Sequence, residues 1–145
     1  MITEKYVSFE TAKLLKDKGF DEECRAFWKE WDGQNMLCHC SSSHVFEWCH
    51  NSMLEGYNDD SELNVATPTL QMAKDWLRVE KKLYIQVDLD GWALGGRRGY
   101  YIVIQGTDND FEDMAPTVNE EDIVFFHTPE EAMEAAIRYC LENLI

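Results

Sequence analysis

The clearest structural signal in the chain is its last segment, residues 122–145, DIVFFHTPEEAMEAAIRYCLENLI. A β-branched and aromatic run, Ile123 to Phe126, stops before Thr128, whose hydroxyl can cap a helix, and Pro129 suits the first helical turn. Apolar residues then recur at helical spacing: Ala132, Met133, Ala136, Ile137, Cys140, Leu141 and Leu144. A wide apolar stripe of this kind must be buried, so we expect this helix to pack on a sheet formed by earlier residues.

Two further segments predict helices. Ser8 can cap a helix that ends at Gly19 in the left-handed conformation, and Phe20 can fold back on its apolar face. Thr67 and Pro68 repeat the pattern of a cap followed by proline. The helix that they start would turn four side chains inward: Leu70, Ala73, Trp76 and Leu77.

Antiparallel strands are predicted in two places. Residues 24–31 precede the turn sequence 32–35, DGQN, and we favour a hairpin there over a helix. Residues 83–90 alternate between apolar and polar side chains, and a glycine-rich link leads to a second strand at 100–105. This order of elements indicates an α+β fold: an antiparallel sheet of about four to five strands with about three helices packed mainly on one face.

The remaining segments carry weaker signals. Ser41 to Ser43 can open a short helix through His50, and residues 56–62 are predicted to form a polar loop. Residues 106–122 hold seven acidic residues and no basic one. Long connections of this kind are often functional in compact domains.

Length and charge limit the class of protein. At 145 residues we expect a single domain, residues 1–145, with a packed core. The formal net charge of −15 disfavours nucleic acid and membranes as direct partners, and it permits basic proteins. The N-terminal sequence lacks the pattern of a secretory signal, and the longest apolar runs are too short to span a bilayer. Because the five cysteines are an odd number, we expect reduced thiols in a cytoplasmic protein.

Three segments carry a resemblance to other proteins. KGFDEEC (residues 18–24), ATPTLQMAKDWL (66–77) and TPEEAMEAAIRYCLENLI (128–145) resemble segments of small proteins of unassigned activity from gut anaerobic bacteria and their phages. The resemblance implies an accessory protein of mobile-element or phage origin. It carries no functional residue over to this chain, because the shared segments hold no chemical motif.

The densest group of metal-binding residue types lies between Cys38 and His50. Zinc is bound tetrahedrally by cysteine and histidine side chains. The candidate ligands here are Cys38, Cys40, His44 and Cys49. The spacing of the first two is tighter than in known zinc sites, and the pattern has no second ligand pair in a distant segment. The alternative is a set of buried free thiols beside surface histidines.

Catalytic patterns are weaker still. Histidines lie near the cysteines in sequence, but a nucleophile and its base usually meet from distant segments. Asp88 and Asp90 share a strand face, as a magnesium site requires, yet Asp90 precedes Gly91 and suits a turn better. The acidic residues after Asp108 lack the glycine and the closing glutamate of an EF-hand calcium loop. We therefore expect no enzymatic activity and no cofactor, with zinc as the alternative.

The leading hypothesis is a non-enzymatic domain that binds another, basic protein. Its predicted contact residues are one tryptophan in the link after residue 90 and four acidic residues in the 106–122 segment: Trp92, Asp108, Asp110, Glu112 and Asp113. The alternatives are a structural zinc module and an acidic DNA mimic that inhibits a nucleic-acid enzyme. Acidic residues also gather at Asp59, Asp60 and Glu62, but a mimic would need an extended stripe of them.

Overall fold

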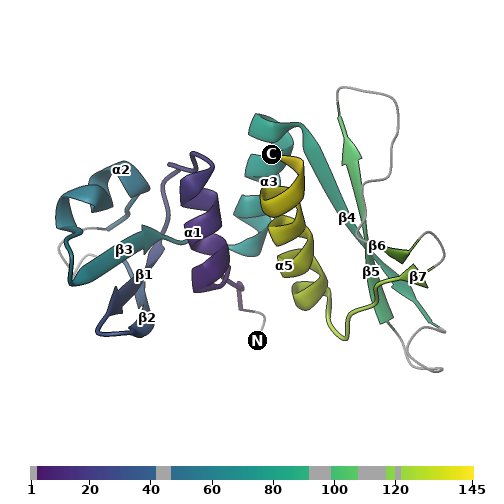
Figure 1. Cartoon of the computed structure of the whole chain (residues 1–145), viewed down its shortest axis with the longest axis horizontal. Helices are drawn as coiled ribbons and strands as arrows, with labels where there is room; N and C mark the ends of the chain where they lie inside the picture. The colour runs from purple at the N-terminus through teal and green to yellow at the C-terminus, as the bar shows by residue number, and fades with distance from the viewer. Residues whose placement is uncertain (1–2, 42–46, 92–98, 108–116, 120–121) are drawn as a thin grey trace. The chain divides into compact units, whose positions relative to one another are not determined.

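The computed structural model describes residues 3–41, 47–91, 99–107, 117–119 and 122–145 (Figure 1). The chain divides into two compact units, Met1–Thr69 and Leu70–Ile145. Each unit contains antiparallel strand pairs of its own and its own buried apolar side chains. The expectation of a single domain stays a prediction.

The first unit begins with helix α1, Phe9–Asp17, whose two predicted caps are confirmed. The Ser8 hydroxyl accepts a hydrogen bond from a backbone N–H of the first turn at 3.2 Å. Gly19 has a φ of 95°, and the Phe20 N–H donates to the Leu15 carbonyl at 2.9 Å, which completes a Schellman cap. Phe20 is buried, so the cap also anchors this end of the helix in the core.

The predicted hairpin is also confirmed. Strand β1 is Ala26–Trp31 and strand β2 is Gln34–His39, with the two-residue turn Asp32-Gly33 between them. Both turn residues have positive φ, 50° and 73°, which a type I′ turn requires and which Asp-Gly adopts readily. The six residue pairs of the two strands follow one another without a register shift.

A strand that the sequence does not predict completes this sheet. Strand β3, Glu62–Ala66, pairs antiparallel with β1 and gives the order β2-β1-β3. Asn64, in the middle of β3, is buried, and its backbone N–H and side-chain amide both donate to the Asn58 side chain. A polar residue at a buried position breaks the apolar pattern that marks a strand, and this explains the missed prediction.

Two short helices precede β3. They are α2, Asn51–Leu54, and the 3₁₀ helix η1, Glu55–Tyr57. The helix predicted to run through His50 is wrong at this end, because His50 is the extended N-cap residue of α2. The predicted start of that helix falls largely on residues 42–46, which lie outside the described residues.

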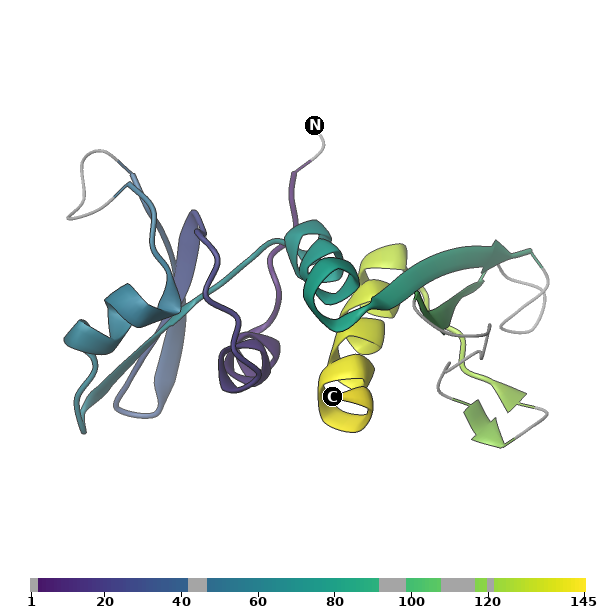
Figure 2. The ribbon, with the colours of Figure 1, turned by 90° about the horizontal axis from the view of Figure 1, so that it is seen from above.

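Helix α1 covers one face of the three-stranded sheet, as Figure 2 shows. The rings of Phe9 on α1 and Trp28 on β1 meet edge to face, with their centroids 6.3 Å apart. The Trp28 indole N–H donates to the Val7 carbonyl at 3.0 Å, so its polar atom is satisfied. The core of the first unit therefore lies between α1 and this face.

The second unit begins with helix α3, Leu70–Lys81, whose four predicted inward residues are all buried. Thr67 does not cap this helix, and that prediction is wrong. Its hydroxyl accepts from the Trp28 N–H and donates to the Val65 carbonyl, each at 3.0 Å. The side chain therefore extends the sheet of the first unit.

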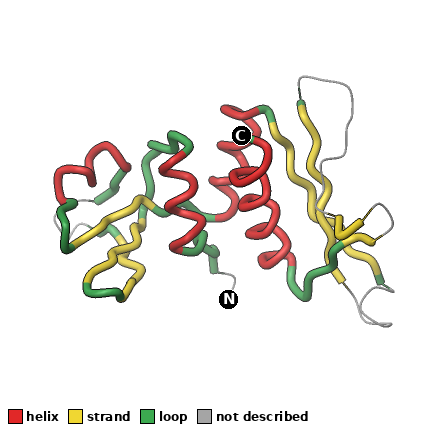
Figure 3. Tube along the Cα trace, viewed as in Figure 1, coloured by secondary structure: helices red, strands yellow, loops and turns green. Residues whose placement is uncertain are grey.

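Strands β4, Leu83–Asp90, and β5, Gly99–Gly106, form the predicted second hairpin. Figure 3 shows α3 and α5, Pro129–Tyr139, side by side next to these strands; a π-helical turn η2, Cys140–Leu144, extends α5. Ile85 pairs with Ile104, and both are fully buried. The sheet face that carries Ile85 and Ile104 packs against the helices. Leu89, near the C-terminal end of β4, is 47% exposed.

The C-terminal helix is built as the sequence predicts. The Thr128 hydroxyl accepts from the Glu131 N–H at 3.1 Å, and Pro129 occupies the first turn. The buried residues of the stripe are Ala132, Ala136, Ile137, Cys140 and Leu141. The helix contacts α3, β4 and β5, so its predicted packing on this hairpin is confirmed.

The fold is α+β, but the prediction of one sheet of about four to five strands is wrong. The described strands form three separate antiparallel sheets: β2-β1-β3, β4-β5, and β6 (Thr117–Asn119) with β7 (Asp122–Ile123). Local periodicity identifies a strand, but it does not specify which other strand supplies the hydrogen bonds.

Candidate functional site

The contact residues predicted from the sequence lie outside the described residues. This applies to Trp92, Asp108, Asp110, Glu112 and Asp113. Their role as a contact surface therefore stays a prediction.

The structure gathers a different set of thiols from the predicted one. Cys24 and Cys49 pair through their backbones, with N–H to carbonyl distances of 2.7 and 2.9 Å. The Cys40 side chain is hydrogen-bonded to that of Cys49. Cys38 instead directs its Sγ to the Met36 carbonyl, 3.8 Å away. Of the predicted zinc ligands, Cys40 and Cys49 thus meet, and the remaining one, His44, lies outside the described residues.

These thiols are protonated at neutral pH. Burial raises the pKa of Cys24 to about 12, and burial also raises the pKa values of Cys38, Cys40 and Cys49. Zinc and nucleophilic chemistry both require the thiolate. Among the described residues, no group of three or more Cys, His, Asp or Glu side chains is placed to hold a metal ion. The zinc site stays a prediction.

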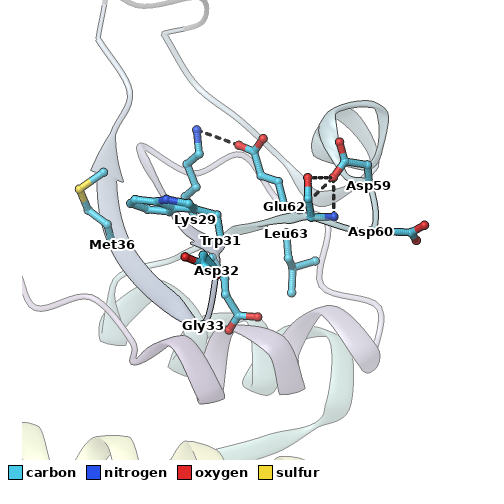
Figure 4. A pocket seen from close by; sticks show the side chains of 11 residues that line it. Lys29, Trp31, Asp32, Gly33, Met36, Asp59, Asp60, Glu62 and Leu63 are labelled. Atoms are coloured by element: carbon cyan, nitrogen blue, oxygen red, sulfur yellow. Dashed lines mark hydrogen bonds and ion pairs between the residues drawn. The ribbon is translucent and has the colours of Figure 1, made fainter.

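The first unit contains an open pocket of about 850 Å³ (Figure 4). One wall is the turn end of the β1–β2 hairpin, including Trp31, Asp32 and Met36. The other wall is the segment Asp59–Leu63, which leads into β3. The pocket thus joins two segments that lie about thirty residues apart in the chain.

Strand register places four side chains of the pocket lining on the same face of the sheet. Trp31 pairs with both Gln34 and Glu62, and Lys29 pairs with Met36. Directly paired residues in an antiparallel sheet project to the same face, and so do residues two apart along one strand. Trp31, Lys29, Met36 and Glu62 therefore share the face opposite the one that carries Trp28.

An ion pair lies in the pocket. The Lys29 ammonium is 2.8 Å from a carboxylate oxygen of Glu62, and it lies 6.0 Å from the centroid of the Trp31 ring. The hydrogen bond to Glu62 raises the pKa of Lys29. Figure 4 shows this bond as a dashed line above the Trp31 ring. The pocket already holds one cation beside its tryptophan.

Asp59 shapes the opposite wall. Its Oδ1 accepts hydrogen bonds from the Ser61 N–H and Ser61 hydroxyl, both at 2.7 Å, and from the Glu62 N–H at 2.9 Å. The bonds from Ser61 lower the pKa of Asp59. This turn fixes the backbone just before β3 begins, and the pairing of β3 with β1 then places Glu62 on the same face as Lys29.

The chemistry of the pocket is acidic and aromatic. Five of its lining residues are acidic and one is basic: Glu30, Asp32, Asp59, Asp60 and Glu62 against Lys29. Trp31 and Met36 are large apolar side chains that remain 39% and 49% exposed. Exposed aromatic surface beside unbalanced carboxylates is suited to a cationic ligand with an aliphatic stem, such as a lysine or arginine side chain.

The sequence carries only part of the signal for this pocket. The Asp-Gly turn and the group Asp59, Asp60 and Glu62 are visible in the sequence, and Trp31 directly precedes the turn. Their meeting depends on the pairing of β1 with β3, and β3 is not predicted. An exposed tryptophan at a hairpin turn is the one local feature that could have drawn attention to this end of the sheet.

Comparison of the chain with protein-family models, with curated proteins and with solved structures finds no match. The resemblance of its helical segments to phage and gut bacterial proteins therefore stays a prediction. Within the described ranges, the structure has no helix with the length and apolar character needed to cross a bilayer.

Proposed function

We propose that this chain is a non-enzymatic binding domain whose first unit holds a basic segment of a partner protein in the pocket beside Trp31. The observation that carries the proposal is the exposed Trp31 ring in a pocket whose lining holds more acidic than basic residues. The net charge of −15 also favours a basic partner, because it attracts positively charged proteins over a longer range.

The energetics of such a contact are favourable but modest. A lysine or arginine cation over an indole ring contributes about 0.5–2 kcal/mol. Lys29 shows that a cation is accommodated beside Trp31, at 6.0 Å from the ring centroid. The carboxylate of Glu62 neutralises the charge of Lys29. The negative charges of Asp32, Asp59 and Asp60 then attract the cations of a partner. We therefore expect a weak, salt-sensitive interaction.

The geometry of the carboxylates favours a short basic segment over a nucleic-acid enzyme as the partner. A DNA mimic presents acidic groups in an extended stripe that follows the spacing of phosphates. In the first unit, Asp32, Asp59, Asp60 and Glu62 line one hollow between the hairpin turn and the Asp59–Leu63 segment, and they do not form an extended stripe. A single extended peptide segment fits this hollow better than a long basic groove does.

A binding measurement tests the proposal. The probe is a blocked peptide of about eight residues that alternates arginine and threonine, a length that matches one β-strand. We expect the peptide to bind the full chain with an affinity that falls as salt is added, and Trp31→Ala to weaken binding about tenfold.

Trp48→Ala is the matched control. Trp48 belongs to the same unit and is 40% exposed, close to the value for Trp31, but it lies outside the pocket lining. Trp48→Ala should bind the peptide like the parent. Equal binding by the Trp31→Ala variant and the parent would rule out this pocket as the site, and so would binding that is indifferent to salt.

A further inference from the structure

Strand β2 lies at the edge of its sheet, with β1 on one side. In an antiparallel pair, residues alternately direct their backbone groups toward the neighbouring strand and away from it. The Cys40 N–H, just after β2, donates to the Arg25 carbonyl at 2.8 Å. This bond shows which residues of β2 face β1, because every second residue from Cys40 does so. The residues between them, Asn35, Leu37 and His39, therefore direct their backbone N–H and C=O groups away from β1, to the open edge.

These outward groups have no hydrogen-bond partner in the part of the chain that the structure describes. Asn35 and His39 are exposed, and Leu37 is half-buried. Edge strands are usually protected by charged side chains, proline or a β-bulge. The sequence of β2, QNMLCH, has no lysine, arginine, aspartate, glutamate or proline, and its register with β1 has no shift. The β2 edge is therefore open to a further strand.

The opposite edge of the same sheet is closed. Strand β3 directs the backbone groups of Asn64 and Ala66 outward, and side chains bond to both groups of Asn64 and to the N–H of Ala66. The Asn58 amide accepts from the Asn64 N–H at 2.6 Å and donates to the Asn64 carbonyl at 3.2 Å. The Asn51 amide accepts from the Ala66 N–H at 2.9 Å. The contrast between the two edges indicates that β2 is the pairing edge of this sheet.

Charge selects the occupant of this edge. A second copy of the chain would bring another net charge of −15 to the same surface, so pairing between two β2 strands is disfavoured. Met36 of β2 lines the acidic pocket, whose other members include Trp31 and Glu62. A basic strand that lies along β2 would pair with its open backbone groups and would bring cations to the acidic pocket.

We propose that an extended basic segment of a partner protein adds to the sheet as a fourth strand, antiparallel to β2, by pairing with the backbone of Asn35, Leu37 and His39. This inference rests on the proposed function, because the same segment carries the cations that enter the pocket. The antiparallel direction follows the rest of the sheet, since purely antiparallel sheets are over-represented. Backbone pairing supplies affinity, and alternate side chains supply specificity.

The pairing also specifies which residues of the segment are basic. A residue opposite Met36 projects to the face that carries Met36 and Trp31, and its neighbours project to the other face. Every second residue of the segment should therefore be lysine or arginine. In antiparallel pairing, the residues on the pocket side direct their own N–H groups away from β2, and the alternate residues bond to it.

Methylated peptides test this arrangement. The parent peptide is the alternating arginine–threonine probe. One variant is N-methylated at every threonine, and a second is N-methylated at every arginine. We expect threonine methylation to weaken binding about tenfold or more, because it removes the N–H groups that face β2, and arginine methylation to leave binding nearly unchanged. Binding of all three peptides with equal affinity would overturn the inference.

Amide hydrogen exchange on the full chain gives a second measurement. With the parent peptide bound, the N–H groups of Asn35, Leu37 and His39 should exchange about tenfold or more slowly than in the free protein. Those of Met36 and Cys38 already face β1 and serve as internal controls. If the peptide binds in a Trp31-dependent manner without slowing exchange at the three outward amides, binding in the pocket is supported and the proposal of an added strand is wrong.

A variant pair separates the backbone from the side chain. Leu37→Pro removes an outward N–H that the sheet itself does not use, and proline is tolerated at edge positions of this kind. Leu37→Ala removes the same side chain but keeps the N–H. We expect only the proline variant to lose peptide binding. If Leu37→Pro fails to fold, the methylated peptides decide the question without it.

Two further outcomes count against the inference. Slowed exchange at the three amides on raising the protein concentration, with dimers seen by sedimentation, would show that a second copy occupies the edge. Failure of the parent peptide to bind the wild-type chain at all would overturn the proposed function, and the added strand with it.

Discussion

Asn58 and Asn64 hold each other in place across the start of β3. The side-chain Oδ1 of Asn58 accepts from both the backbone and the side-chain N–H of Asn64, at 2.6 and 3.1 Å, and its Nδ2 donates back to the Asn64 backbone carbonyl at 3.2 Å. Asn64 is 4% exposed, so these bonds satisfy polar groups that water reaches poorly. The pair closes one edge of the sheet and anchors the segment that forms one wall of the pocket.

Asn58→Ala should therefore destabilise the first unit. The substitution leaves buried polar groups of Asn64 without partners, which costs about 1–3 kcal/mol. Urea unfolding, followed by a signal from the first unit, measures the loss. The exposed Asn35→Ala variant is the control and should unfold like the parent. Equal midpoints for both variants would contradict the structural role of Asn58.

Ile137→Ala should destabilise the second unit strongly. Ile137 is fully buried on α5, which contacts α3, β4 and β5. Removing a buried isoleucine side chain to alanine costs about 2–5 kcal/mol, with the cavity included. Val79→Ala on α3 removes apolar atoms from a side chain that is 51% exposed, and it should scarcely change the melting temperature. If Ile137→Ala melts like the parent, α5 is not part of this core.

Stability should fall on acidification partly through Asp21. Its carboxylate accepts from the Ser52 N–H at 2.7 Å and from the Ser52 hydroxyl. Burial raises the pKa of Asp21, but its hydrogen bonding with Ser52 and with the His50 ring outweighs this effect, and the net pKa is lowered from the ordinary 3.8. A lowered folded-state pKa means that the stabilisation is present above about pH 4 and is lost as the pH falls through the folded pKa.

Asp21→Asn tests this contribution. The Asp21 side chain is 44% exposed, so solvent screens the interaction, and we expect a loss of only about 0.2–1 kcal/mol at neutral pH. The variant should also lose less stability than the parent between neutral pH and pH values below about 4. Unfolding curves over a pH series measure both effects, and Glu23→Gln, at an exposed carboxylate nearby, is the control.

Thiol labelling should separate the cysteines into two classes. Cys38 and Cys40 are half-buried, whereas Cys24, Cys49 and Cys140 are buried. Burial raises the pKa values of Cys24 and Cys140 to about 12, so little thiolate forms at them near neutral pH. With a thiol reagent at mildly alkaline pH, we expect the buried three to react at least about a hundredfold more slowly until the protein unfolds. Rapid labelling of all five in the native protein would contradict this burial.

Metal analysis decides the zinc alternative. Because the described residues gather no group of three or more potential ligands, we expect the purified chain to hold far less than one equivalent of zinc, and a chelator to leave its melting temperature unchanged. A stoichiometric zinc content, with melting lowered by the chelator, would instead support a structural site. Such a site would use Cys40 and Cys49, the predicted ligands that the structure brings together.

Several elements of the fold follow from short stretches of sequence. Ser8 and Thr128 cap their helices with hydroxyls three residues from the N–H groups that they bind. Asp32 and Gly33 form a tight turn because both adopt positive φ, and Gly19 ends α1 for the same reason. Each feature depends on contacts within a few residues, which is why the pattern of residues suffices to predict it.

Thr67 shows where local reasoning fails. By position it resembles Thr128, since each is a threonine followed by proline before a helix. Thr67, however, bonds to Trp28, which lies 39 residues away in the sequence, and its hydroxyl extends the sheet. The same dipeptide therefore has two structural roles, and the difference lies in which distant backbone group is within reach.

The sequence by itself determined the helix caps, the tight hairpin turn and the buried stripe of α5, because the sterics and hydrogen bonds behind them act over one or two turns of chain. Only the tertiary structure decided that the strands divide among separate sheets, and that the turn at Trp31 meets the Asp59–Leu63 segment to form an acidic pocket. The pairing of β1 with β3 brings these segments together, and the bonds of Asn58 to Asn64 close the outer edge of β3. Strand pairing depends on which backbone groups find partners far along the chain, and no local pattern encodes that choice.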